Sequence, residues 1–178
     1  MSSNDTTIIR KSIREKIRIA HELLATLGDS LRGDRRISEL LADLQMKTAA
    51  SRQAMFDLGI VSICRFCEDE DGGSCCGRGI EDKYDPVLLL TNLLLGIRLP
   101  EHRFQTDSCY FLGREGCCLE ARDVICVNYL CRKLQTVIPP HDLIRLQTLN
   151  GEELDAAFAL TEAIKKFICH ESRCKSPG

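Results

Sequence analysis

The chain has 178 residues, of which 44% are hydrophobic and 28% charged, and its formal net charge is −2 at pH 7. These values exclude a chain that is disordered over most of its length. The small net charge also excludes a general attraction to nucleic acid or to an acidic membrane surface, so neither is predicted as a partner.

The first third of the chain contains no cysteine and predicts two helices. Between residues 7 and 27 the apolar side chains recur at steps of three and four, which forms one stripe of an amphipathic helix. Asp34 is placed to cap the start of a second helix, and Gly59 to end it. We expect residues 1–60 to form an antiparallel helical hairpin, which either packs on the rest of the protein or protrudes as a coiled-coil arm for a protein partner or a homodimer.

A short and strongly apolar helix is predicted after Asp85-Pro86. Aspartate suits the N-cap, and proline suits the first helical position, where its missing N–H breaks no hydrogen bond. As a helix, residues 87–97 rise only about 16 Å, roughly half of a bilayer core. We therefore expect a buried central helix that Gly96 ends, and not a membrane span.

Residues 136–178 predict a C-terminal helical segment, because helical periodicity of the apolar residues returns there. Asn150-Gly151 either separates two helices or bends one. Residues 171–178 are expected to fray, with Cys169 and Cys174 as free thiols.

Cysteine dominates the centre of the chain, since nine of the 11 cysteines fall within residues 61–135. They are Cys64, Cys67, Cys75, Cys76, Cys109, Cys117, Cys118, Cys126 and Cys131. The polar first residues lack the basic and then apolar run of a secretory signal, so a cytoplasmic, reducing location is predicted and disulfides are disfavoured. Clustered cysteines in that setting are typical of metal or redox chemistry. The expected fold is mostly α, with the hairpin and the C-terminal helices around a small, irregular metal-binding centre.

The cysteine spacing predicts how the thiolates divide among sites. Cys64 and Cys67 form a C-x2-C motif, which can turn onto one ion through a tight knuckle. Cys126 and Cys131 are separated by about 140° on an ideal helix, so they can share an ion only if Cys126 lies at or before the helix start. Nine thiolates exceed the four of a single site. The count favours two four-cysteine sites or one larger cluster, with one cysteine to spare.

Two vicinal pairs, Cys75-Cys76 and Cys117-Cys118, leave the ligand set open. One member of a pair ligates while the other packs, or the pair divides between neighbouring sites. The acidic run at residues 68–71 lacks the ligand spacing of a calcium loop, so a solvated loop is expected there. No catalytic motif is recognisable, although His102, close to the second cysteine stretch, is a candidate second-shell group or substitute ligand.

The cysteine pattern resembles that of the YkgJ-like cysteine-cluster family, whose members are regarded as zinc- or iron-chelating. The matching motifs are Cys64-x-x-Cys67, Cys75-Cys76, Cys109-Tyr110-Phe111-Leu112, Gly116-Cys117-Cys118 and Arg122-Asp123-x-x-Cys126-x-x-Tyr129-x-Cys131. The chain departs from the family in a longer, more acidic spacer after Cys67 and in Asp123, where the family has proline. The resemblance implies metal chelation by these cysteines.

The leading functional prediction is a metal-chelating protein that binds an iron–sulfur cluster or zinc and acts in redox or metal handling. Both cofactors accept thiolate ligands, so the donor type does not separate them. The alternative is a protein-interaction adaptor in which zinc staples the centre and the hairpin of residues 1–60 recruits the partner.

Overall fold

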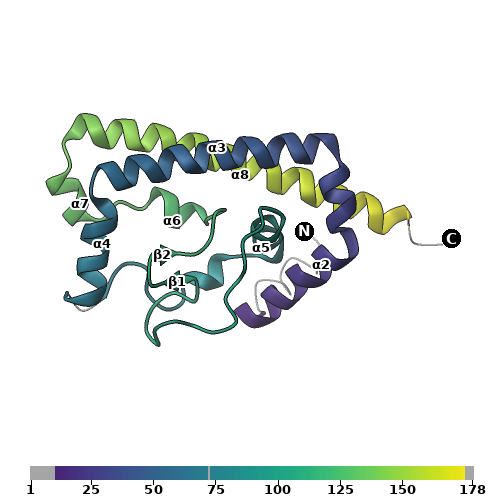
Figure 1. Cartoon of the computed structure of the whole chain (residues 1–178), viewed down its shortest axis with the longest axis horizontal. Helices are drawn as coiled ribbons and strands as arrows, with labels where there is room; N and C mark the ends of the chain where they lie inside the picture. The colour runs from purple at the N-terminus through teal and green to yellow at the C-terminus, as the bar shows by residue number, and fades with distance from the viewer. Residues whose placement is uncertain (1–10, 72, 175–178) are drawn as a thin grey trace.

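The computed structural model describes residues 11–71 and 73–174, with the backbone alone for Cys174. The protein is mostly helical, as predicted (Figure 1). Its helices are α2 (Ile13–Gly33), α3 (Arg35–Asp57), α4 (Ile60–Asp69), α5 (Pro86–Leu94), α6 (Val124–Asn128), α7 (Arg132–Val137) and α8 (Pro140–Cys174), with a 3₁₀ turn, η1 (Ile80–Lys83). Strands β1 (Leu112–Gly113) and β2 (Gly116–Cys117) form a small antiparallel hairpin.

The two N-terminal helices pack on the rest of the protein and do not protrude. The two helices are not antiparallel to each other as predicted, because α2 lies at an angle to α3 and packs on α5 (Figure 1). Helix α3 instead runs antiparallel to α8 along the molecule. The Asp34 carboxylate accepts a 2.9 Å hydrogen bond from the Ile37 amide, so the predicted N-cap is confirmed. Residues 7–10 of the first predicted helix lie outside the described residues.

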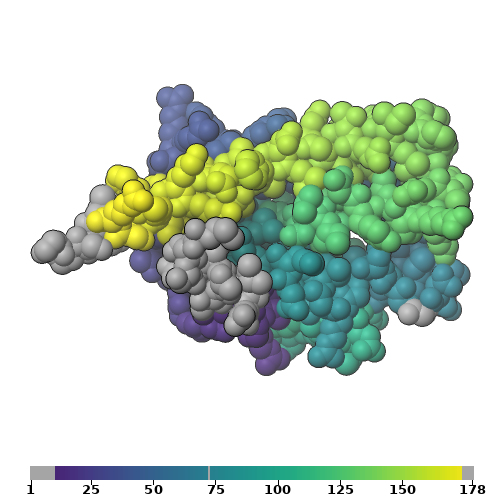
Figure 2. All heavy atoms as spheres, turned by 180° about the vertical axis from the view of Figure 1, so that it is seen from behind, coloured from purple at the N-terminus to yellow at the C-terminus, as the bar shows by residue number. Residues whose placement is uncertain are grey.

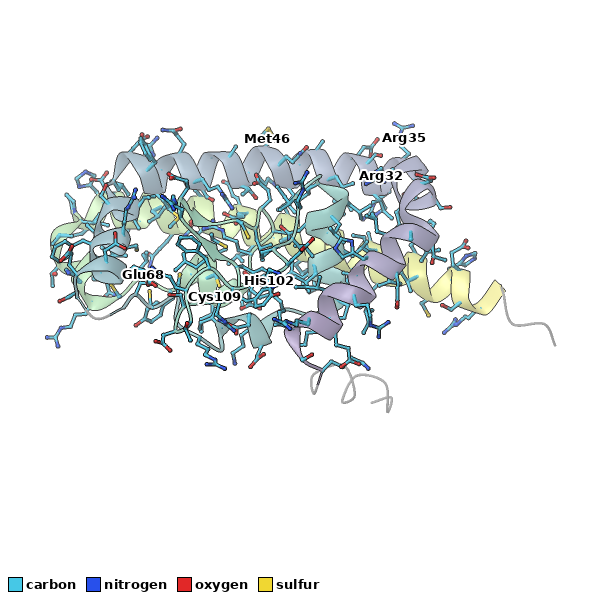
Figure 3. All side chains as sticks on the ribbon, turned by 60° about the horizontal axis from the view of Figure 1, so that its bottom comes forward. Arg32, Arg35, Met46, Glu68, His102 and Cys109 are labelled. Atoms are coloured by element: carbon cyan, nitrogen blue, oxygen red, sulfur yellow. The ribbon has the colours of Figure 1, made fainter. Side chains whose placement is uncertain are left out.

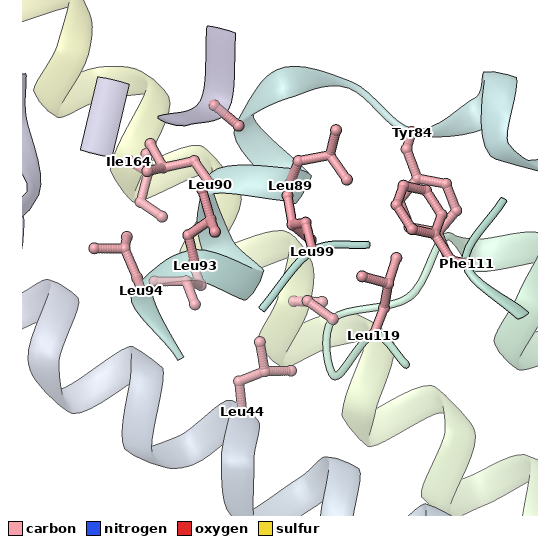
Figure 4. Packing of buried hydrophobic residues seen from close by; sticks show 14 of the residues in the cluster. Leu44, Tyr84, Leu89, Leu90, Leu93, Leu94, Leu99, Phe111, Leu119 and Ile164 are labelled. Atoms are coloured by element: carbon pink, nitrogen blue, oxygen red, sulfur yellow. The ribbon is translucent and has the colours of Figure 1, made fainter. Parts of the chain in front are cut away.

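Helix α5 is central, as its composition predicts. The Asp85 carboxylate caps it by accepting a 2.8 Å hydrogen bond from the Leu88 amide, and Gly96 follows it with a φ of 82°. Leu89 and Leu90 are fully buried, and the surrounding core takes side chains from residues 1–60, 61–135 and 136–178 alike (Figure 4). Of the helices in the described ranges, none is long and apolar enough to cross a membrane.

Helix α8 runs without interruption past Asn150-Gly151, so these residues do not separate two helices. The Asn150 side chain is buried and donates a 2.8 Å hydrogen bond to the Val127 carbonyl, which links α8 to α6. Seen from behind, α8 extends along the whole molecule above the cysteine-rich residues (Figure 2). The helix reaches Cys174, so the expected fraying at residue 171 is wrong, and residues 175–178 lie outside the described part.

The sequence predicts no helix directly after Gly59, but α4 forms there. Gly59 adopts a φ of 69°, a left-handed conformation that turns the chain sharply between α3 and α4. Ile60 is buried in a second apolar cluster with Leu134 and Leu146. These partners come from α7 and α8, so tertiary packing stabilises a helix that local composition does not predict.

Candidate metal centre

The thiols of the centre are free and close to one another, but they do not converge on a common point. The ten cysteines whose side chains are described form no disulfide among themselves. Within residues 11–71 and 73–174, no group of three or more His, Cys, Asp or Glu side chains is arranged to hold a metal ion. The donor type suits a thiophilic metal, and binding would require the sulfur atoms to close up around it.

One set of thiols, the inner group, lies where the two cysteine-rich stretches meet. It consists of Cys76, Cys109, Cys117 and Cys126, which pack on the main apolar cluster. An isolated antiparallel bridge pairs Gly77 with Ser108, and beside it the Cys109 amide donates a 2.6 Å hydrogen bond to the Cys76 carbonyl. This pairing brings together cysteines that the sequence places in separate clusters.

A short hairpin and a buried tyrosine position the other two thiols of the inner group. Cys117 ends β2 and pairs with the first residue of β1. The Tyr84 hydroxyl donates to the Cys126 sulfur over 3.7 Å and accepts a hydrogen bond from the Asp123 amide. The Tyr84 ring is buried and packs edge-on against Phe111, with 5.0 Å between the ring centres. The phenol therefore holds the start of α6, and with it Cys126, against the core.

A second set of thiols, the outer group, lies at the contact of α4 with α7. It consists of Cys64, Cys67, Cys75 and Cys131. Cys64 and Cys67 are one turn apart on α4, and Cys131 is the N-cap residue of α7. The Lys133 ammonium lies 3.4 Å from the Cys67 sulfur and 4.9 Å from the centre of the Phe66 ring. These contacts hold the first turn of α7 beside the cysteine-bearing side of α4.

Glu68 on α4 holds the loop that carries Cys75. Its carboxylate accepts a 2.9 Å hydrogen bond from the Ser74 amide and further hydrogen bonds from the Ser74 and Ser108 hydroxyls. Glu68 and Cys109 lie on the same side of the molecule, below α3 (Figure 3). The prediction of a solvated acidic loop is therefore wrong for Glu68, which joins α4 to both cysteine-rich stretches.

The clustering of thiols disfavours their charged form. Burial raises the pKa of Cys64 to about 11, and repulsion from the other three thiolates of the outer group adds to the shift. Burial likewise raises the pKa of Cys76 to about 12, with added repulsion from Cys75 and from the other three thiolates of the inner group. A bound cation would relieve both effects, because metal ligation requires and stabilises the thiolate.

Positive side chains lie near both groups. Burial raises the pKa of Cys117, but the nearby guanidinium groups of Arg122 and Arg52 oppose that shift. Arg52 donates a hydrogen bond to the Leu119 carbonyl, which keeps its charge beside β2. At the outer group, Lys133 supplies the corresponding charge. Four thiolates around a divalent ion leave a net negative charge, which these cations would offset.

The structure revises the expected use of several cysteines. Cys64 and Cys67 lie on a regular helix and not in a tight knuckle. Cys126 lies inside α6 and not at or before its start, so it falls in the inner group while Cys131 falls in the outer group. Cys118 is exposed and belongs to neither group. Of the vicinal pair Cys117 and Cys118, only Cys117 packs with the other cysteines of the inner group.

The described histidine side chains and that of Cys169 are exposed. His102 is exposed, and its role as a substitute ligand stays a prediction. His141 is exposed near the start of α8, and His21 is exposed on α2. Cys169 is an exposed free thiol on α8, whereas the side chain of Cys174 lies outside the described part.

Four residues that contact the thiols or their loops were not predicted from the sequence. Tyr84, Glu68, Arg52 and Lys133 act on cysteines or loops far away in the chain or in a different element. No local spacing marks such a contact, since it depends on how the elements pack. Only covariation between the partners could reveal these pairs from sequence.

Comparisons of the chain with family models, with curated proteins and with solved structures found no match. The resemblance to the YkgJ-like family therefore stays a prediction from the cysteine motifs. The function has to be argued from where the side chains lie.

Proposed function

We propose that this protein chelates metal through its clustered cysteines, as zinc ions or as an iron–sulfur cluster, and acts in metal handling or redox chemistry. The observation that supports this most is that the fold brings free thiols from residues 64–76 and 109–131 near one another, through the backbone hydrogen bond that joins Cys109 to Cys76. Four thiolates are the ligand set of a tetrahedral zinc ion and of a cubane cluster. The protein supplies the thiolates, and it places positively charged side chains and a tyrosine phenol beside them.

The adaptor alternative has less support. The stripe residues Ala20 of α2 and Ile37 and Leu44 of α3 are buried and these helices pack on α5 and α8, so the predicted stripe is covered. Met46 and Phe56 of α3, which are not part of that stripe, are exposed. If zinc stabilises the centre while the stripe is covered, the protein is still a metal-binding protein, as proposed above. No second function is therefore advanced.

The test is an assay of iron, acid-labile sulfide and zinc on protein purified without oxygen, together with its visible absorption spectrum. Matched iron and sulfide with a brown colour identify an iron–sulfur protein, and stoichiometric zinc without colour identifies a zinc protein. Protein that contains neither metal and takes up neither under anaerobic conditions would contradict the proposal.

A pair of matched variants makes the assay specific for the centre. Cys109→Ser should reduce the metal content, because Cys109 is a buried member of the inner group. Cys169→Ser should leave it unchanged, because Cys169 is exposed on α8. Equal metal loss in both variants would show that the metal is not held where we place it.

A further inference from the structure

Two cysteines lie opposite each other where the two cysteine-rich stretches pair. The antiparallel bridge sets Gly77 opposite Ser108. Cys76, which precedes Gly77, therefore lies opposite Cys109, which follows Ser108. The 2.6 Å hydrogen bond from the Cys109 amide to the Cys76 carbonyl is the backbone contact of such an opposed pair. A 2.7 Å backbone hydrogen bond on the other side of the bridge keeps the same register.

The backbone geometry of an opposed pair suits a disulfide bond. At a hydrogen-bonded position the Cα atoms of opposed residues are about 5.5 Å apart, and a disulfide joins Cα atoms about 4.4–6.8 Å apart. Opposed residues also direct their side chains to the same face of the pairing. Here that face is the core, because Cys109 is 6% exposed within the main apolar cluster and Cys76 packs against it.

Glu68 holds the two paired segments together. Its carboxylate accepts hydrogen bonds from Ser74, two residues before Cys76, and from Ser108, directly before Cys109. One side chain of α4 thus contacts both stretches beside the two cysteines. The fold has already closed the chain between these cysteines, so a bond between them requires only local movement.

The vicinal pairs are poorer partners for a disulfide. Adjacent residues have Cα atoms about 3.8 Å apart, closer than the minimum of about 4.4 Å for an ordinary disulfide. Cys76 is therefore better placed to bond to Cys109 than to its neighbour Cys75.

We propose that Cys76 and Cys109 form a reversible disulfide when the protein meets a peroxide, which joins the two cysteine-rich stretches covalently. The bond needs no bound metal. Opposed Cβ atoms are about 4.5–5.5 Å apart, so closing the bond requires them to approach by about 1 Å. A disulfide closed under such strain is reduced more easily, as befits a switch and not a permanent crosslink.

The reaction consumes one peroxide for each disulfide. The thiolate of Cys76, the less buried of the two residues, attacks a peroxide oxygen; the S–O bond forms, the O–O bond breaks, and the leaving hydroxide takes up a proton. The Cys109 thiolate then attacks the sulfenic sulfur, so that the S–S bond forms and a second hydroxide leaves as water. Two thiols and hydrogen peroxide thus give one disulfide and two waters. The oxidised pair has no thiolate to offer a metal.

The experiment uses the full chain, reduced and freed of reductant, with EDTA present and hydrogen peroxide as the probe. Because burial raises the pKa of Cys76 to about 12, the first step is slow at neutral pH, and the reaction is run at about pH 8.5. The remaining thiols are then alkylated and the linked peptides are identified by mass spectrometry. Cys76 should be the main partner of Cys109, and dithiothreitol should release the link.

Two neighbouring serine variants assign the partner. Cys76→Ser should abolish the main link to Cys109. Cys75→Ser, the matched control at the adjacent position, should leave that link unchanged. In urea, which removes the pairing of the two stretches, Cys109 should lose its preference for Cys76 and link to several cysteines.

Three results would overturn the proposal. They are a different main partner of Cys109 in the folded protein, loss of the link in Cys75→Ser, and absence of the link after the exposed Cys169 has been oxidised in the same sample. None of them bears on metal binding, because the reaction is followed with EDTA present. Absence of metal from the purified protein, in turn, would leave the disulfide standing.

Discussion

Asn92 is a fully satisfied polar side chain within the apolar helix α5. Its amide nitrogen donates 2.9 Å hydrogen bonds to the carbonyls of Leu88 and Ala121. Its oxygen accepts from the amides of Glu120 and Ala121, at 2.8 and 3.0 Å. All the hydrogen-bonding positions of the side chain are therefore used. The residue that interrupts the apolar run of α5 in the sequence thus holds the segment leading from the hairpin to α6.

Asn92→Leu should lower the free energy of unfolding by at least about 2 kcal/mol, because the N–H and C=O of Ala121 and the N–H of Glu120 lose their partner. Urea denaturation measures the change. Asn128→Leu is the matched control, since Asn128 is exposed on α6, and it should change the free energy by less than about 0.5 kcal/mol. Equal effects of the two substitutions would show that the Asn92 hydrogen bonds contribute little.

At the scale of elements, a buried ion pair joins α8 to the segment before α6. The Arg122 guanidinium contacts both oxygens of Glu153, at 3.0 and 3.1 Å, and both side chains are almost fully buried. From α3, the Ser51 hydroxyl donates to the same carboxylate. Desolvation of two charges is costly, so such a pair stabilises a fold less than its geometry suggests.

Glu153→Leu should lower the free energy of unfolding by about 3–5 kcal/mol, because it leaves Arg122 buried and unpaired. The double variant Arg122→Met and Glu153→Leu should recover most of this loss, since no charge then remains buried. The exposed pair Arg35 and Glu39 provides the comparison, and Glu39→Leu should cost less than about 1 kcal/mol. A double variant as unstable as the single one would mean that the pair's attraction exceeds its desolvation cost.

The elements also differ in how far the sequence predicts them. The caps at Asp34 and Asp85 were predicted, because an N-cap needs only residues within one helical turn. Helix α4 was not, because its apolar side packs on α7 and α8, which follow much later in the chain. The cysteines were identified as candidates, but their grouping depends on the bridge between Gly77 and Ser108, which no spacing reveals.

At the scale of the whole molecule, Glu81 connects distant loops to the core. Its carboxylate accepts hydrogen bonds from the Arg103 guanidinium and from the amides of Gly79 and Tyr110. Burial opposes the charged form, but these hydrogen bonds and the Arg103 charge outweigh it and lower the pKa of Glu81 below its ordinary value. The folded protein therefore binds a proton at Glu81 less readily than the unfolded chain does.

Because the pKa of Glu81 is lowered in the folded protein, the free energy of unfolding should fall as the solution becomes acidic. The stabilisation from Glu81 is complete well above the ordinary carboxyl pKa of 4.5 and is lost as the pH falls through the lower pKa of the folded state. Urea denaturation between about pH 6 and pH 3 should show a weaker acid dependence in Glu81→Gln than in the unmodified protein. Glu115→Gln, at an exposed turn, is the control. An unchanged acid dependence in Glu81→Gln would contradict the prediction.

The pairing of α3 with α8 has a consequence for how the chain folds as it is made. Helix α3 is complete at Asp57, but its partner begins only at Pro140. At about 5–20 residues per second, a ribosome needs roughly 4–17 s to reach Pro140 after Asp57. During that interval the apolar side of α3 stays without its final partner, and such transiently exposed apolar surface promotes aggregation.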